Sequence, residues 1–156
     1  MNKWYKYVVL FFASGSFVGY IPFVSGTFGS LLGLILYIVL HNYLTTLWLI
    51  IISIIFFFMG VYASHKAEQI LNEQDSSKIV IDEIVGMIVT MLFLKPNLTN
   101  LAAGFITFRA FDIIKPPPIS YVDKNIRGGF GVMFDDLIAG VFANIVIHAG
   151  ILLYHL

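Results

Sequence analysis

The sequence contains no cysteine and few charged residues. Without cysteine the chain cannot form disulfides, thiolate nucleophiles or cysteine-based zinc sites, and hydrolysis through a covalent cysteinyl intermediate is excluded. Only 12% of the 156 residues are charged, whereas a soluble domain usually has about 25%. The formal net charge is zero, so the composition does not indicate nucleic-acid binding. The chain has too little polar surface to cover a water-soluble protein of this size.

Hydrophobic residues make up 59% of the chain, and the mean hydropathy is +0.90. We therefore predict an all-α, polytopic membrane protein that forms a single membrane-embedded domain over residues 1–156. About five apolar segments are expected, at residues 30–40, 44–62, 84–94, 98–111 and 137–154. The second and fifth are long enough to span a bilayer alone, since a span needs about 20 residues. The others are short or re-entrant. A polar stretch at residues 64–78 and a proline- and glycine-rich loop at residues 115–131 are expected to link segments.

The N-terminal segment places Lys3 and Lys6 before a short apolar run at residues 8–13. A cleaved signal peptide is one interpretation of this pattern. The small-residue cleavage site is poor, so an N-terminal helix that lies in the membrane interface is the favoured prediction.

The basic residues gather on one membrane face in the predicted topology. If each of the five segments crosses, residues 64–83 and 109–136 share a face with the loop at residues 22–29, and Lys95 falls on the opposite face. If the N-terminal helix lies flat on that face, eight of the nine basic residues lie together: Lys3, Lys6, Lys66, Lys78, Arg109, Lys115, Lys124 and Arg127. The positive-inside rule makes that face cytoplasmic. All nine acidic residues fall on the same side.

Two carboxylates, Asp82 and Glu83, interrupt the apolar run IVIDEIVGM at residues 79–87. An ionised side chain in the hydrocarbon costs at least about 2.5–3.5 kcal/mol. Such residues normally face a wet cavity, a partner or an ion. Gly86 lies on the helix face of Asp82 and would let a backbone or a ligand come close.

Two further runs carry acidic and basic residues. In FRAFDIIKPPPI, residues 108–119, Arg109 and Asp112 are three residues apart and can meet on a helix face; a plain interfacial ion pair is the alternative. In GGFGVMFDDLIAG, residues 128–140, a glycine-rich loop leads into a helix that we expect to open with Asp135 and Asp136. Helix capping by Asp135, with Asp136 favoured by the helix dipole, is the alternative there.

A fourth run, SGTFGS at residues 25–30, places small and hydroxyl residues before an apolar helix. Backbone N–H groups at such a position can hold a phosphate, although an ordinary helix start has the same appearance.

Together, these runs predict a metal site. Five carboxylates from three helix ends would repel one another unless a cation lies between them: Asp82, Glu83, Asp112, Asp135 and Asp136. Hard oxygen ligands suit Mg²⁺, which usually takes one or two carboxylates, waters and a phosphate. Arg109 and Lys115 would receive the remaining phosphate charge. An ion or solute transporter is the alternative, since intramembrane carboxylates fit it too, and a non-catalytic scaffold is a third.

The runs GTFGS, IVIDEIVGM, FRAFDIIKPPPI and GGFGVMFDDLIAG resemble those of the phosphatidylglycerophosphatase A family, in the family's order and over about residues 20–145. Two positions depart from the family pattern: Ser25 stands where proline is frequent, and Asp75-Ser76 stands where some members have Asp-His. The resemblance implies a Mg²⁺-dependent hydrolase of the bacterial inner membrane. Its substrate would be the lipid phosphatidylglycerophosphate, whose terminal phosphate it would remove to give phosphatidylglycerol.

From this resemblance we expect Asp82, Glu83, Asp112 and Asp136 to be catalytic, and Arg109, Lys115, Thr27 and Ser30 to bind the substrate phosphate. Direct hydrolysis with a carboxylate as general base is the expected route, and an aspartyl phosphate is the alternative. Adjacent residues on a helix point about 100° apart, so each acidic pair is expected to supply one metal ligand and one supporting group.

Overall fold

The computed structural model describes residues 2–154, so that Met1 and residues 155–156 of the predicted single domain lie outside the described part. Seven α-helices and one 3₁₀ turn form this part, with no strand in residues 2–154, and the predicted all-α class is confirmed. The elements are α1 (Lys3–Ala13), η1 (Val18–Tyr20), α2 (Ser25–Tyr43), α3 (Thr46–Leu71), α4 (Ile81–Met91), α5 (Leu98–Ile114), α6 (Ile119–Asn125) and α7 (Gly128–Tyr154).

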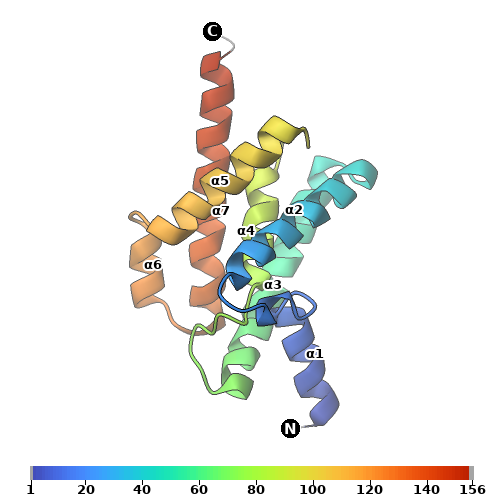
Figure 1. Ribbon diagram of the computed structural model, residues 1–156, viewed down its shortest axis with the longest axis vertical. Helices are drawn as coiled ribbons and strands as arrows, with labels where there is room; N and C mark the ends of the chain where they lie inside the picture. Colours follow the sequence, from blue (N-terminus) through green and yellow to red (C-terminus); the bar gives the residue numbers. More distant parts are fainter. Residues whose placement is uncertain (1, 155–156) are drawn as a thin grey trace.

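The short helix α4 lies at the centre, with α2, α3, α5 and α7 packed around it (Figure 1). Every residue of α4 is buried except Asp82 and Glu83 in its first turn. The reason is compositional: after this turn α4 has no charged residue, so no face of it requires solvent. Close packing is helped on α2 by Gly33, where a Cβ would meet the Ile84 carbonyl oxygen at 2.7 Å.

The five main helices alternate in direction. In Figure 1, α2, α4 and α7 run upward, whereas α3 and α5 run downward. The link between α4 and α5, which contains Lys95, lies at the opposite end. This alternation is the one that the sequence predicted.

Three helices, α2, α3 and α7, are long and apolar enough to cross a membrane. The sequence predicted only two such segments, because residues 25–29 and 41–43 continue α2 beyond the apolar run at 30–40. With 11 residues, α4 is about 16 Å long, about half of the ~30 Å hydrocarbon core. Its burial by protein on all sides makes a short element acceptable at membrane depth.

Two expected loops are partly helical. The polar stretch at residues 64–78 was expected to link two segments, but α3 continues to Leu71, and only the rest is a link. The expected loop at residues 115–131 contains α6 and the first turn of α7. Close contact explains both extensions: Gly129 has no side chain, so α7 can begin directly against the Val61 carbonyl and the His65 backbone of α3.

The early start of α7 corrects two predictions about its aspartates: the helix does not open with Asp135 and Asp136, and Asp135 does not cap it. Because α7 begins at Gly128, Asp135 lies about two turns inside the helix and cannot be its N-cap. Both aspartates are buried, with Asp136 only 3% exposed.

The N-terminal helix α1 is present as predicted. Asn2 caps it through its side chain, and α1 packs along α3, where the hydroxyls of Tyr5 and Tyr62 lie 2.8 Å apart. Exposed apolar side chains line its outer side: Trp4, Tyr7, Val8 and Phe11.

Candidate active site

Three carboxylates from two helices converge where α4 meets α7. Asp82 and Glu83 stand in the first turn of α4, and Asp136 reaches them from α7. Each offers one oxygen, and these three oxygens lie within 4.8 Å of one another. We call these three residues the acidic cluster.

The acidic cluster contains carboxylate oxygens that are buried and unsatisfied. Asp82 Oδ1, Glu83 Oε2 and Asp136 Oδ2 are inaccessible to solvent and have no hydrogen-bond partner within residues 2–154. A buried charge without a partner is strongly unfavourable, and natural proteins normally pair such a charge or use it to bind a metal. The donor set of three hard oxygens therefore fits a divalent cation such as Mg²⁺.

A cationic side chain borders the acidic cluster from α5. Arg109 forms an ion pair with Asp112 one turn later on the same helix, through Nη1 and Oδ2. Nη1 also lies 3.5 Å from the hydroxyl of Ser30, which itself donates to the Gly26 carbonyl at 2.9 Å. Ser30 is fully buried, so its contact with Arg109 links α2 to α5 inside the protein.

The first turn of α2 completes this side of the site. A Cβ placed on Gly26 would come within 2.5 Å of Glu83 Oε1 and 3.1 Å of Arg109 Nη1. The absence of a side chain at this position therefore allows the carboxylate and the guanidinium to approach the α2 backbone. Thr27 follows, half-buried, and its hydroxyl makes no hydrogen bond within the described chain.

Lys115, at the C-terminal end of α5, joins two acidic residues. Its ammonium donates to Asp123 of α6 at 2.5 Å and to Asp135 of α7 at 2.6 Å. Burial acts to lower the pKa of Lys115, but the hydrogen bonds to Asp123 and Asp135 outweigh it and raise the pKa above its ordinary value. Lys115 therefore stays charged at neutral pH.

The two acidic pairs differ in arrangement. Asp135 turns toward Lys115 while Asp136 enters the acidic cluster, as the 100° rotation between neighbours on a helix predicts. Asp82 and Glu83 are arranged differently, because both place an oxygen in the acidic cluster. Glu83 is the longer side chain and can reach back across its helix.

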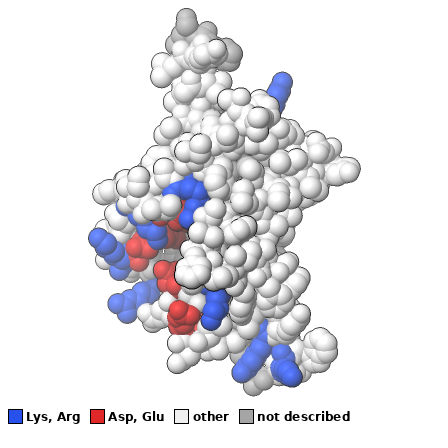
Figure 2. Space-filling view, in the orientation of Figure 1, with Lys and Arg blue, Asp and Glu red and all other residues white. Residues whose placement is uncertain are grey.

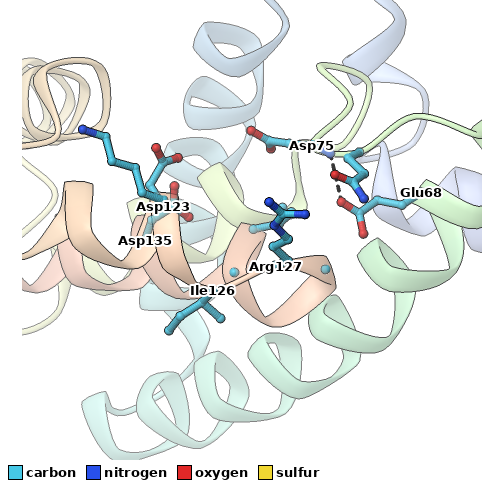
Figure 3. A pocket seen from close by; sticks show the side chains of 11 residues that line it. Glu68, Asp75, Asp123, Ile126, Arg127 and Asp135 are labelled. Atoms are coloured by element: carbon cyan, nitrogen blue, oxygen red, sulfur yellow. Dashed lines mark hydrogen bonds between the residues drawn. The ribbon is translucent and has the colours of Figure 1, made fainter.

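A polar pocket of about 260 Å³ opens beside Asp135, between the N-terminus of α7, α6 and the link after α3. In Figure 3 the guanidinium of Arg127 projects into it, with Asp123 and Asp135 on one side and Asp75 and Glu68 on the other. The Glu68 carboxylate holds the backbone of Asp75, whose N–H donates to Oε1 at 2.9 Å.

Sequence patterns did not single out Asp123, Arg127 and Glu68, which the structure adds to the surroundings of the site. The nearest signal was the proximity of Asp123 and Arg127 to the proline- and glycine-rich stretch. Figure 2 shows the acidic residues gathered on one part of the molecule, with basic residues around them.

Comparisons with known proteins identify the family of the chain. The family model of phosphatidylglycerophosphatase A matches residues 11–151. A phosphatidylglycerophosphatase A of Escherichia coli K12 is 37% identical over 154 residues, which is 98% of this chain and 83% of the relative. One from Haemophilus influenzae is 38% identical over 126 residues, 80% of this chain and 77% of the relative.

A third relative, from Bacteroides thetaiotaomicron, is 38% identical over 136 residues, 83% of this chain and 84% of the relative, and is provisionally named a phosphatidylinositol-3-phosphatase. No solved structure matches the chain significantly. The family match covers all four sequence runs and all five carboxylates. The prediction of a phosphatase is thereby confirmed at the level of the family, and the chain belongs to the phosphatidylglycerophosphatase A family.

Proposed function

We propose that this protein hydrolyses the terminal phosphate of phosphatidylglycerophosphate to give phosphatidylglycerol in the bacterial cytoplasmic membrane, and that its catalytic domain spans residues 1–156. The observation that carries the proposal is the convergence of Asp82, Glu83 and Asp136 beside Arg109, in a chain that two phosphatidylglycerophosphatases match over most of its length. The family match favours this activity over the transporter alternative.

The acidic cluster is the proposed Mg²⁺ site. Asp82, Glu83 and Asp136 would hold the ion, which explains why each keeps a buried oxygen without a hydrogen bond. Asp112 and Asp135, also predicted as ligands, each pair with a basic residue of the chain and would adjust the charge beside the ion. When bound, Mg²⁺ would polarise the phosphate and make an attacking water more acidic.

Arg109 is the proposed phosphate clamp. Asp112 and Ser30 hold its guanidinium next to Gly26, so the remaining N–H donors can face a phosphate at the start of α2. Ser30 is buried and would act by positioning Arg109, whereas Thr27 is placed to donate to a phosphate or glycerol oxygen. Lys115 has three N–H donors, of which two are used by carboxylates, and the third is available for phosphate.

A carboxylate that does not bind the ion would take the proton from the attacking water. Asp112 is the proposed candidate. It pairs with Arg109 at the edge of the acidic cluster, and it could give up this ion pair to accept the proton of the water. An aspartyl phosphate remains the alternative route.

The proposed orientation places the site at the cytoplasmic face. The positive-inside rule supports it: eight of the nine Lys and Arg residues belong to the same side of the alternating helices, and Lys95 belongs to the other. The acyl chains would stay beside the apolar helices while the headgroup reaches the acidic cluster.

A second substrate has a specific observation behind it, namely the relative named for a phosphoinositide. Both lipids carry a phosphate monoester on a polyol headgroup, so the same ion and the same arginine would serve either one. Phosphate release by the purified protein from each lipid, with and without Mg²⁺, tests the proposal. If the protein releases phosphate from neither lipid, the proposal is overturned. If it releases phosphate faster from the phosphoinositide, the phosphoinositide is the substrate instead of phosphatidylglycerophosphate.

A further inference from the structure

The link between η1 and α2 exposes an apolar surface directly before the site. Phe23 is 102% exposed, as open as in an unfolded chain, although phenylalanine is normally buried. Four nearby apolar side chains are exposed with it: Tyr20, Ile21, Val24 and Phe28. We call these five residues the rim.

Phe23 also has a backbone conformation that non-glycine residues rarely adopt, with φ of +73°. Phe17 shares this conformation with φ of +68°, but its ring packs against Tyr7, Phe11 and Tyr20 at centroid distances of 5.3–5.6 Å. Phe23 has no ring contact within residues 2–154. The strained backbone at Phe17 thus has an internal reason, whereas that at Phe23 presents an aromatic ring to the surroundings.

The rim adjoins the site on one side. Phe23 comes three residues before Gly26, which faces Glu83 and Arg109. On α5, Ile113 and Ile114 follow Asp112 directly and are also exposed. Exposed apolar residues therefore adjoin site residues along the chain on both α2 and α5.

The rim carries a basic residue and continues into a membrane helix. The ammonium of Lys78 lies 5.8 Å from the centre of the Tyr20 ring. The rim leads directly into α2, which is apolar enough to cross a membrane. Aromatic rings with a nearby lysine are typical of the boundary between headgroups and acyl chains, and the lysine complements an anionic lipid surface.

We propose that the rim inserts into the headgroup boundary of an anionic bilayer, with Phe23 as its anchor, and that lipid substrates enter the site over it. The occupant of this surface is the lipid itself. The entry of substrate rests on the proposed function, whereas the insertion of the rim does not.

Insertion is tested by fluorescence quenching in vesicles of phosphatidylcholine and phosphatidylglycerol. The full chain carries Phe23→Trp in a background of Trp4→Phe and Trp48→Phe, and a second chain carries Gln69→Trp, on an exposed polar position of α3. Lipids brominated near the headgroup should quench the tryptophan at position 23 and shift its emission to the blue, and should leave that at position 69 unchanged. Equal, water-like emission from both would overturn the proposal.

Substrate entry is tested with Phe23→Gly, which suits the positive φ and removes the benzyl side chain. With long-chain phosphatidylglycerophosphate in vesicles, kcat/KM should fall about tenfold, as expected for the loss of one buried aromatic ring. With a short-chain, monomeric form of this lipid, kcat/KM of Phe23→Gly should stay within about twofold of the wild-type value. Phe23→Leu, which keeps an apolar side chain, should retain the wild-type rate on vesicles. Tyr43→Ser, which removes an aromatic ring at a position 84% exposed at the far end of α2, is the control.

Equal losses on both substrates, or the same loss in Tyr43→Ser, would contradict entry over the rim. A wild-type protein that hydrolyses neither substrate would contradict the proposed function, while the quenching result would still decide whether the rim inserts.

Discussion

Gly86 of α4 and Gly140 of α7 pack backbone against backbone, and each lies four residues after an aspartate of the acidic cluster. A Cβ on Gly140 would collide with the Gly86 carbonyl oxygen, and one on Gly86 would come within 2.8 Å of the Asp136 carbonyl oxygen. The hydroxyl of Thr90 donates to the Gly86 carbonyl at 2.9 Å, and Asn144 donates to the carbonyls of Thr90 and Leu92 at 2.8 Å each. Four residues are about one helical turn. The close contact of the two glycines therefore brings Asp82 and Asp136 together one turn before it on each helix.

Gly86→Ala should therefore reduce activity by separating the two helices. Overpacking of this kind typically costs about 1–3 kcal/mol, and a shift of about 1 Å at the acidic cluster should lower kcat by about 100-fold. Thermal unfolding and phosphate release check both effects. Gly150→Ala on α7 is the control, because a Cβ there meets nothing within 4 Å, and equal effects in the two variants would contradict the crossing as the cause.

Asp82→Asn and Asp136→Asn should abolish most activity and the response to Mg²⁺. The three carboxylates repel when no ion is bound, so each variant should be as stable as the wild type or more stable in EDTA. An ion at 100 times its Kd stabilises the wild type by about 2.7 kcal/mol, and the variants should lose this gain. The measurement is the melting temperature with Mg²⁺ and with EDTA; Glu73→Gln, on the exposed link after α3, should behave as the wild type.

Arg109→Lys should lower kcat/KM by about 10- to 100-fold although it keeps the charge. A lysine cannot hold Asp112 and Ser30 and also present a planar pair of donors to a phosphate. Steady-state kinetics on phosphatidylglycerophosphate check this prediction. If Arg109→Lys retains full activity and Arg109→Gln does not, the clamp geometry is refuted and only the positive charge matters.

Lys115→Met should destabilise the contact between α6 and α7. Hydrogen bonds to charged groups contribute about 1.5–3 kcal/mol, and two are lost here. Because the pKa of Lys115 is raised in the folded protein, its contribution is fully present below its unfolded value of about 10.4 and is lost as the pH rises through the folded value. The difference in melting temperature between wild type and variant should thus be constant from pH 7 to about pH 10 and shrink above it.

Gly26→Ala should impair catalysis more than stability. The added methyl group would press on Glu83 Oε1 and the Arg109 guanidinium, both of which are ends of flexible side chains. The fold can accommodate this by moving those groups, but the site then loses its arrangement. We expect kcat/KM to fall about tenfold or more, with little change in melting temperature; a large drop in melting temperature instead would assign Gly26 a packing role.

The sequence predicted the elements that follow from local pattern. The five apolar segments fall largely within α2, α3, α4, α5 and α7, because runs of apolar residues in a chain with little charge can only be satisfied as helices in a membrane. Their ends were less predictable. Residues 64–71 are polar but continue α3, and residues 128–134 are rich in glycine but begin α7, because contacts between these two helices outweigh local propensity.

The surroundings of the site were predictable only in part. Arg109 and Asp112 pair as their spacing predicted, since a helix fixes which residues share a face. Asp123 and Arg127 could not be found this way, because no periodicity connects them to Asp135 or to Asp75 across the pocket.

By itself, the sequence determined the helical membrane class, the alternation that collects the acidic residues at one end, and the four runs that mark the family. The tertiary structure alone decided which carboxylates meet. A helix sets the direction of each side chain about its own axis, but the position of that axis depends on close packing with other helices. Here the contact of Gly86 with Gly140 sets the position of α4 against α7 and brings Asp82 and Glu83 close to Asp136. Asp112 and Asp135 instead form ion pairs with Arg109 and Lys115.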